Sequence, residues 1–283
     1  MLPDALSVAL RGLSFVALLQ AAGIATFVAL FRPYLAGSGI GIRRLGMWSA
    51  VITLPLLLGQ YLLEPARMAG EMTGVFDPAL QRLVMTSRVA VTFAARVVGL
   101  ACIAAPLTRA TAVSALAGLL GGALVAVSFA LMGHTAVHAW RPLLAPAVTA
   151  HVFIAAFWFG ALPALYIATL REAPDRAGRL IEAFSSLALW LVPTLAIVGL
   201  LLAVILVRRL VVFGEPYGWL LVAKVVGLTA LLGLAAANKR RLGPAVAHGE
   251  ARGFKQSLVA EYALIVGVLA VTATMTSLFS PTE

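Results

Sequence analysis

Long uninterrupted apolar runs restrict this chain to one class of fold. The chain of 283 residues is 62% hydrophobic and 11% charged, with a mean hydropathy of +1.02. Its apolar runs of about 20 residues each can cross a membrane as helices, whereas β-barrel strands would alternate apolar and polar residues. The sequence predicts an all-α, polytopic membrane helical bundle with about eight transmembrane helices. The predicted spans are 6–31, 45–63, 87–107, 111–132, 146–170, 184–207, 217–237 and 257–279.

The basic residues predict the orientation of these spans. The net charge is +10, which in a soluble protein would suggest a nucleic-acid partner. Here twelve of the 21 Lys and Arg residues fall in the first, third, fifth and seventh loops, so the positive-inside rule explains them better. We therefore expect these loops in the cytoplasm, both termini outside, the lipid bilayer as surroundings and no nucleic-acid partner. The lone cysteine, Cys102, excludes an intramolecular disulfide and a thiolate-based metal cluster.

Three of the four histidines, His134, His138 and His151, fall in one short stretch on the predicted outer side. Histidine is costly beside a bilayer and well suited to bind a transition metal. If the fourth helix continues past the lipid, His134 and His138 share one face, and His151 at the top of the fifth span completes a site. Met132 adds a thioether, and imidazole with thioether suits copper. The alternative is that these histidines bond only to headgroups or backbone.

Two further segments on the outer side bear on this site. Pro142 and Pro146 predict a break that returns the chain tightly into the fifth span. Met68 and Met72 are four residues apart, so a short helix would pair their sulfur atoms as further metal ligands. The alternative for these two methionines is an interfacial helix whose side chains dip into lipid.

Charged residues within the predicted spans are the next unusual feature. Arg96 lies near the middle of its span, so we expect it to face the bundle interior and meet a partner. Lys224 lies about five residues inside the outer edge of its span and can partly snorkel outward. Glu261 lies in the first predicted turn of the last span, which favours a helix-end anchor facing cytoplasmic water.

An internal repeat relates the two halves of the chain. The segment 95–100 (ARVVGL) recurs as 223–228 (AKVVGL), and the first and fifth spans align with Gly23 near Gly160. Four spans in each half give both halves the same orientation. We therefore expect two parallel four-helix repeats, 1–132 and 133–283.

Several of these segments resemble one known family, the copper-resistance protein D family (CopD/PcoD). The similarity is carried by Gly133-His134, by the tryptophan-containing stretch 151–160 (HVFIAAFWFG), by 217–224 (YGWLLVAK), by 238–244 (NKRRLGP) and by Glu261. It extends over about 133–280, and the first half fits mainly through its span count and 92–96. The resemblance implies a bacterial inner-membrane copper transport protein. It also implies that His134 and His151, which match the family's pattern, are the best candidates for copper ligands.

The resemblance also implies a partner. Such proteins commonly work with a periplasmic copper carrier of the C type, and because no such domain precedes the first span we expect a separate carrier. The expected function is capture of copper at the periplasmic face and movement across the membrane, inward, in copper homeostasis and resistance, without enzymatic activity. The alternatives are a haem-b-binding membrane oxidoreductase, which would carry paired histidines deep in the bundle, and a non-catalytic membrane subunit.

Overall fold

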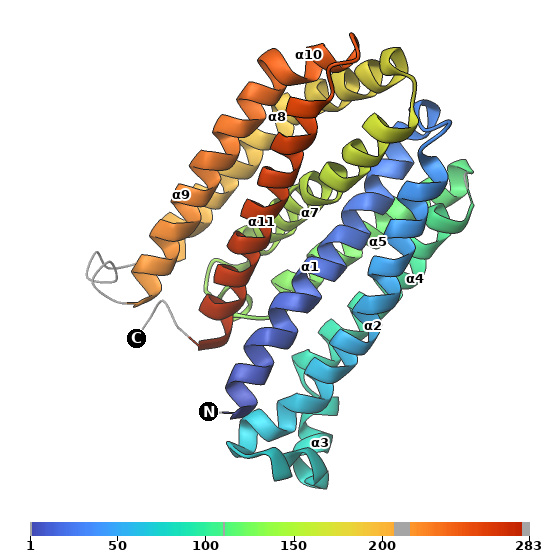
Figure 1. Cartoon of the computed structure of the whole chain (residues 1–283). Helices are drawn as coiled ribbons and strands as arrows, with labels where there is room; N and C mark the ends of the chain where they lie inside the picture. Colours follow the sequence, from blue (N-terminus) through green and yellow to red (C-terminus); the bar gives the residue numbers. More distant parts are fainter. Residues whose placement is uncertain (1, 110, 207–215, 279–283) are drawn as a thin grey trace.

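The chain folds into a bundle of long helices joined by short turns (Figure 1). A computed structural model describes residues 2–109, 111–206 and 216–278. In chain order, the elements are α1 (Leu2–Phe31), η1 (Arg32–Tyr34), α2 (Gly39–Ala69), η2 (Met72–Phe76), α3 (Pro78–Met85), α4 (Arg88–Thr108), α5 (Ala112–Ala130), α6 (His134–Val137), α7 (Arg141–Arg171), α8 (Pro174–Leu206), α9 (Pro216–Ala237), the π-helical η4 (Asn238–Leu242), α10 (Gly243–Val246) and α11 (Arg252–Leu278).

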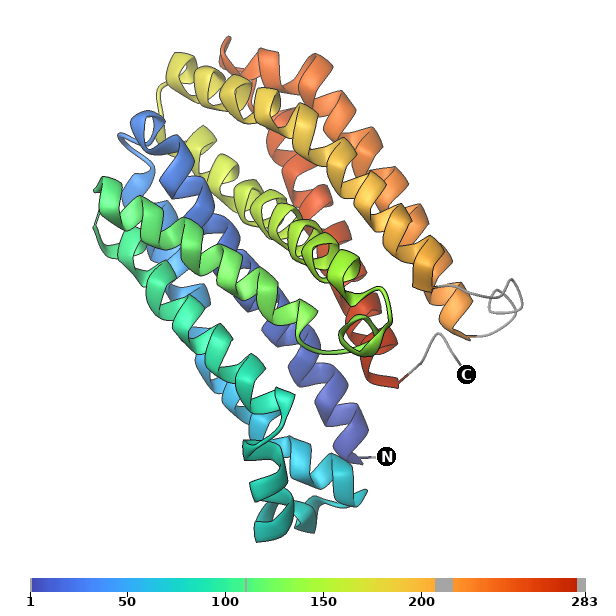
Figure 2. The same ribbon diagram turned by 180° about the vertical axis from the view of Figure 1, so that it is seen from behind.

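Eight of the helices are long and apolar enough to cross a membrane, counted over the described residues. They are α1, α2, α4, α5, α7, α8, α9 and α11, and no β-strand occurs in the described ranges. This confirms the predicted all-α polytopic bundle. The described ends of α1 and α11 lie at the same end of the bundle as α3, and η1 and α10 lie at the opposite end (Figures 1 and 2). We refer to these as the α3 end and the α10 end.

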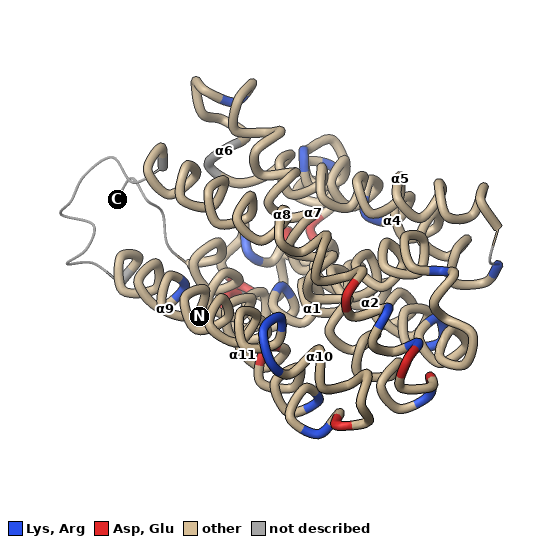
Figure 3. The backbone as a smooth tube through the Cα atoms, turned by 90° about the horizontal axis from the view of Figure 1, so that it is seen from above, with Lys and Arg blue, Asp and Glu red and all other residues tan. Residues whose placement is uncertain are grey.

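Several helices extend beyond the predicted spans. Helix α2 begins at Gly39 instead of residue 45, α8 at Pro174 instead of 184, and α11 at Arg252 instead of 257. All three extra segments lie at the α10 end and carry Lys or Arg. Because these residues are polar, the apolar run that predicts a span is shorter than the helix itself. Seen from above, Lys and Arg positions clearly outnumber Asp and Glu positions (Figure 3), as the composition requires.

The core of the bundle is built around α1 and α7. Helix α1 packs against α2, α4, α5, α7 and α11, and its Phe27 and Ile24 are fully buried. Helix α1 crosses α7 where Gly23 meets Gly160, and a Cβ atom added to Gly160 would lie 2.4 Å from the Gly23 carbonyl carbon. Such close backbone approach between membrane helices requires glycine. Glycine at both positions therefore sets the distance between these two helices.

The helix pairs repeat between the two halves of the chain. Helix α1 packs on α2, α5 and α11, and α7 packs correspondingly on α8, α11 and α5. Helix α4 packs on α5 as α9 packs on α11. Helices α2 and α4 also pack together, whereas contact between α8 and α9 is at most slight, so the second half is more open.

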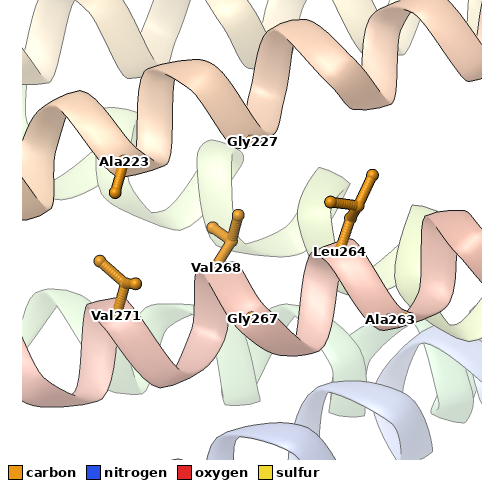
Figure 4. A pocket seen from close by; sticks show the side chains of 7 residues that line it. All are labelled: Ala223, Gly227, Ala263, Leu264, Gly267, Val268 and Val271. Atoms are coloured by element: carbon orange, nitrogen blue, oxygen red, sulfur yellow. The ribbon is translucent and has the colours of Figure 1, made fainter.

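A shallow apolar groove lies between α9 and α11 (Figure 4). It is lined by small residues on both helices, including Ala223, Gly227, Ala263 and Gly267. Small side chains at such positions let membrane helices approach closely. Ala223 and Gly227 belong to the repeated segment, so part of that sequence similarity reflects helix packing.

Glu172 joins two turns at the α10 end. Its side chain is 2% exposed, and it accepts hydrogen bonds from the backbone N–H groups of Gly37 and Ser38, both at 2.8 Å, and from the Ser38 hydroxyl at 2.7 Å. Burial alone would raise the pKa of Glu172, but the hydrogen bonds from Ser38 and Gly37, helped by the Arg176 guanidinium, lower it below its ordinary value. The ionised carboxylate therefore ties the α1–α2 turn to the α7–α8 turn.

We expect stability to fall in acid because of Glu172. A carboxyl with a lowered folded pKa stabilises the fold above its unfolded pKa of about 4.3, and this contribution is lost as pH falls through the folded pKa. Glu172→Gln should lower the free energy of unfolding near neutral pH by about 1–3 kcal/mol. It should also make the stability less dependent on pH in the acid range. Thermal unfolding in detergent across acid pH measures both effects. The exposed Glu182→Gln is the control, and equal acid sensitivity in Glu172→Gln and wild type would contradict the assignment.

Candidate metal site

The connection from α5 to α7 carries two of the three histidines. Helix α5 ends at Ala130, Gly133 has a positive φ of 79°, and α6 covers only four residues, His134–Val137. His138 follows in an extended conformation. The expected continuation of the fourth helix through both His134 and His138 is therefore wrong, because α5 ends before His134 and α6 ends before His138. The side chain of His134 lies outside the described part of the structure.

His138 holds the turn into α7. Its Nδ1 accepts a hydrogen bond from the Trp140 backbone N–H at 3.1 Å. In a neutral ring with Nδ1 as acceptor, the proton resides on Nε2, so neither nitrogen has a lone pair available for a metal in this arrangement. Nearby, Arg88 of α4 donates to the Ala136 carbonyl at 3.1 Å and holds α6 against the bundle. The structure thus gives His138 a local structural role.

His151 lies inside α7 and not at its start. Helix α7 begins at Arg141, with Pro142 in its first turn and Pro146 within it, so the expected break between the two prolines is wrong. Proline is tolerated in the first turn of a helix, and neighbouring helices accommodate it further inside a membrane helix. His151 is ten residues past Arg141, which places it about 15 Å along the helix. The helix thus begins five residues before the predicted span 146–170, and His151 lies within it and not at its first residues.

The surroundings of His151 orient its ring. Nδ1 lies 3.3 Å from the Leu195 carbonyl oxygen of α8, and because that oxygen only accepts, Nδ1 carries the proton. Nε2 of a neutral ring then has the lone pair that binds metals, and a backbone carbonyl behind the other nitrogen is a common orienting partner of histidine ligands. Gly199 makes room, since a Cβ atom there would lie 3.0 Å from His151 Cε1. Among the described histidine side chains, His151 is the best prepared as a ligand.

The intramembrane cations lie in different parts of the bundle. Arg96 of α4 donates to the Ser128 hydroxyl at 3.1 Å, and its guanidinium stacks 4.8 Å from the centroid of the Phe129 ring. Its partners on α5 are thus a hydroxyl and an aromatic ring. Lys224 of α9 is half-buried. The two cations occupy equivalent positions in the repeated segment, Arg96 on α4 and Lys224 on α9.

The methionines are arranged differently from expectation. Met68 lies in the last turn of α2 and Met72 begins η2, with Gly70 in a left-handed conformation between them at φ 77°. The expected short helix carrying both is wrong, because Gly70 ends α2. Both side chains are exposed, and Met132 is half-buried just beyond the end of α5. Within residues 2–109, 111–206 and 216–278, no three His, Cys, Asp or Glu side chains are placed to hold a metal ion together.

Glu261 is buried and does not face water. It lies nine residues past the start of α11 and is 2% exposed, so the expected helix-end anchor is wrong. Its carboxylate accepts hydrogen bonds from Trp158 Nε1 of α7, at 3.2 Å, and from Asn238 Nδ2 of η4. Trp158 and Asn238 belong to the segments that resemble the family, but the sequence did not assign them a role. The spacing of seven residues between His151 and Trp158, two helical turns, is the signal that puts both on one face of α7.

These features define a multi-pass helical membrane protein with an oriented histidine and a buried carboxyl in its second half. The N-terminal domain model of copper resistance protein D-like proteins matches residues 1–141, and the model of copper resistance protein D matches residues 178–275. The chain belongs to the copper resistance protein D family. It is therefore a membrane protein of copper resistance and transport. His134 and His138 fall within the first matched segment, whereas His151 lies between the two. No curated protein and no solved structure matches the chain.

Proposed function

We propose that the protein captures copper at its periplasmic end and moves it inward across the bacterial inner membrane. The observation that carries this proposal is His151, which is held by the Leu195 carbonyl with Nε2 available, inside a member of a copper-resistance family. His134 is the second proposed ligand, with Met132 as a thioether donor and His138, Met68 and Met72 as weaker candidates. Imidazole with thioether is a donor set that suits copper, and thioether favours Cu(I).

The second half of the bundle is the proposed route. His151 and Trp158 follow one face of α7, and the slight contact between α8 and α9 leaves this half less tightly closed than the first. The repeated helix pairs support the interpretation that 1–132 and 133–283 are parallel four-helix repeats related by an axis along the membrane normal. The crossing of α1 and α7 at Gly23 and Gly160 fits such an axis, since these are equivalent positions in the two repeats.

In this proposal the α3 end, with α6 and both termini, faces the periplasm. The support is the concentration of Lys and Arg in the turns at the α10 end. In a Cys102→Ser background, we expect Val137→Cys, at an exposed position of α6, to react with a membrane-impermeant maleimide in intact spheroplasts. Glu250→Cys, at the α10 end, should react only after permeabilisation. The reverse pattern would contradict this orientation. Delivery by a separate periplasmic copper carrier of the C type belongs to the same proposal.

Copper uptake by reconstituted vesicles tests the function. Vesicles that contain the protein should accumulate copper faster than protein-free vesicles, and equal rates would contradict the proposal. The visible spectrum of the purified protein is measured on the same sample. A Soret band that sharpens on reduction would favour the haem-b oxidoreductase instead, because it reports iron held by paired histidines.

A further inference from the structure

Three helical segments converge on the carboxyl group of Glu261. Trp158 of α7 donates to Oε2 and Asn238 of η4 donates to Oε1, while Glu261 itself lies on α11. Asn238 lies in a π-helical segment that directly follows α9, and π-helical turns are frequent at functional sites. Two N–H donors directed at one carboxylate, at a site out of contact with water, form a built polar site.

Among the described residues, no ion pair supplies a positive charge to this carboxylate. The ion pairs found among the described residues do not include Glu261, and hydrogen bonds from Trp158 and Asn238 are the interactions found for it. Lys239, Arg240 and Arg241 of η4 are exposed, and α7 contributes Trp158. An ionised carboxylate buried without a countercharge is costly, so the site needs a proton or a cation.

Tyr262, the next residue in α11, is a further titratable group close to Glu261 in the sequence. Its hydroxyl donates to Gln20 of α1 at 2.5 Å, and its ring stacks on Phe159 with a centroid distance of 4.7 Å. The partner that α1 provides for Tyr262 is therefore an amide and not a charged group. Arg252 and Lys255 of α11 lie at least one and a half helical turns before Glu261, toward the α10 end.

Two buried oxygen atoms beside Glu261 have no partner in the described structure. They are Asn238 Oδ1 and Ser257 Oγ, on residues that are 9% and 6% exposed. Ser257 lies four residues before Glu261 and so on the same face of α11. If the Asn238 amide turns over, Oδ1 accepts from a protonated carboxyl group, whereas in the present orientation Nδ2 donates to the ionised one. The site can therefore satisfy Glu261 in both protonation states.

The donor set selects a proton over copper. Glu261, Asn238 and Ser257 offer oxygen atoms, whereas copper prefers imidazole and sulfur ligands. The two N–H groups of Trp158 and Asn238 also occupy positions next to the carboxylate that a metal ion would need. A proton adds the missing positive charge without displacing either donor.

We propose that Glu261 is an intramembrane proton-binding site whose loading and release accompany copper movement through the second half of the bundle. The part that concerns copper rests on the proposed function. Trp158 lies two turns, about 10 Å, further along α7 than His151, so both groups border the same route. Proton-binding carboxyl groups facing the interior of transport proteins are a recurrent means of coupling ion movement to the proton gradient.

Infrared difference spectra recorded over a pH titration test the proton site without copper. We expect a carboxylic-acid C=O band that titrates in wild type, is absent in Glu261→Gln and is retained in the exposed control Glu182→Gln. Trp158→Phe removes a donor to the ionised form, so the midpoint of this band should move to higher pH. Identical spectra for wild type and Glu261→Gln would overturn the proton site.

Vesicles with an internal pH indicator test the coupling. Copper added outside wild-type vesicles should produce a change in internal pH that is at least several-fold smaller in Glu261→Gln. An equal pH change in both proteins, or copper uptake by wild type with no pH change, would overturn the coupling. If wild-type vesicles take up no copper at all, the proposed function fails and so does the coupling, while the infrared titration still decides whether Glu261 binds a proton.

Discussion

Copper uptake by vesicles that contain the His134→Ala/His151→Ala variant is expected to fall to the rate of protein-free vesicles. Mutating residues that merely hydrogen-bond to metal ligands lowers metal affinity or activity by about 10–100-fold. The double variant removes two proposed ligands themselves, so we expect the uptake rate to fall by at least this factor. His151 should account for most of the loss. Its ring is held by the Leu195 carbonyl, which leaves the Nε2 lone pair available to a metal. Alanine at this position has no atom that can bind a metal ion.

The other two histidines provide matched controls. His248 lies exposed in the turn before α11, at the α10 end, so His248→Ala should leave uptake unchanged. His138→Ala should lower uptake less than His151→Ala does, because His138 Nδ1 is engaged with the Trp140 N–H group. Equal copper affinity in wild type and in the double variant would show that the proposed site is wrong, even if the protein transports copper.

Gly160→Val is expected to prevent stable folding. A Cβ atom at this position would lie 2.4 Å from two backbone atoms of α1, the Gly23 carbon and the Ile24 nitrogen, and a backbone does not move aside as a flexible side chain does. Overpacking a core costs about 1–3 kcal/mol when side chains adjust, and more is expected here because the two central helices must separate. Thermal unfolding and the elution profile in detergent measure the effect.

Gly12→Ala is the matched control on α1. Its added Cβ atom would lie 3.7 Å from the Ala273 side chain, an ordinary contact, and alanine favours the helix. This variant should keep or slightly raise the unfolding temperature. If Gly160→Val unfolds at the same temperature as wild type, the close crossing of α1 and α7 is not the feature that holds the two halves together.

The membrane spans were predictable because they depend on local composition. A run of apolar residues has to become a helix in lipid, since each backbone polar group must be satisfied within its own segment. The helix ends were less predictable. Helices α2 and α11 begin several residues before their apolar runs, because basic turns at the α10 end continue the helix outside the hydrocarbon region.

The candidate site was predictable in its residue types but not in its geometry. The clustering of His134, His138 and His151 in the sequence pointed to one region, but α6 ends at Val137 and His138 is extended, so the first two do not lie on one continuous helix. The partners of His151 are a carbonyl group and a glycine of α8, about 45 residues away, and a backbone carbonyl has no signature in sequence.

The sequence by itself determined that this protein is an eight-helix membrane bundle with a basic end and a histidine-rich segment at the other, since hydropathy and charge act residue by residue along the chain. Only the tertiary structure decided that Glu261 is buried against Trp158 and Asn238 and that the ring of His151 is oriented by α8. The physical reason is that burial and hydrogen bonding depend on which faces of distant helices meet. The crossing of α1 and α7 at Gly23 and Gly160 is another contact of this kind.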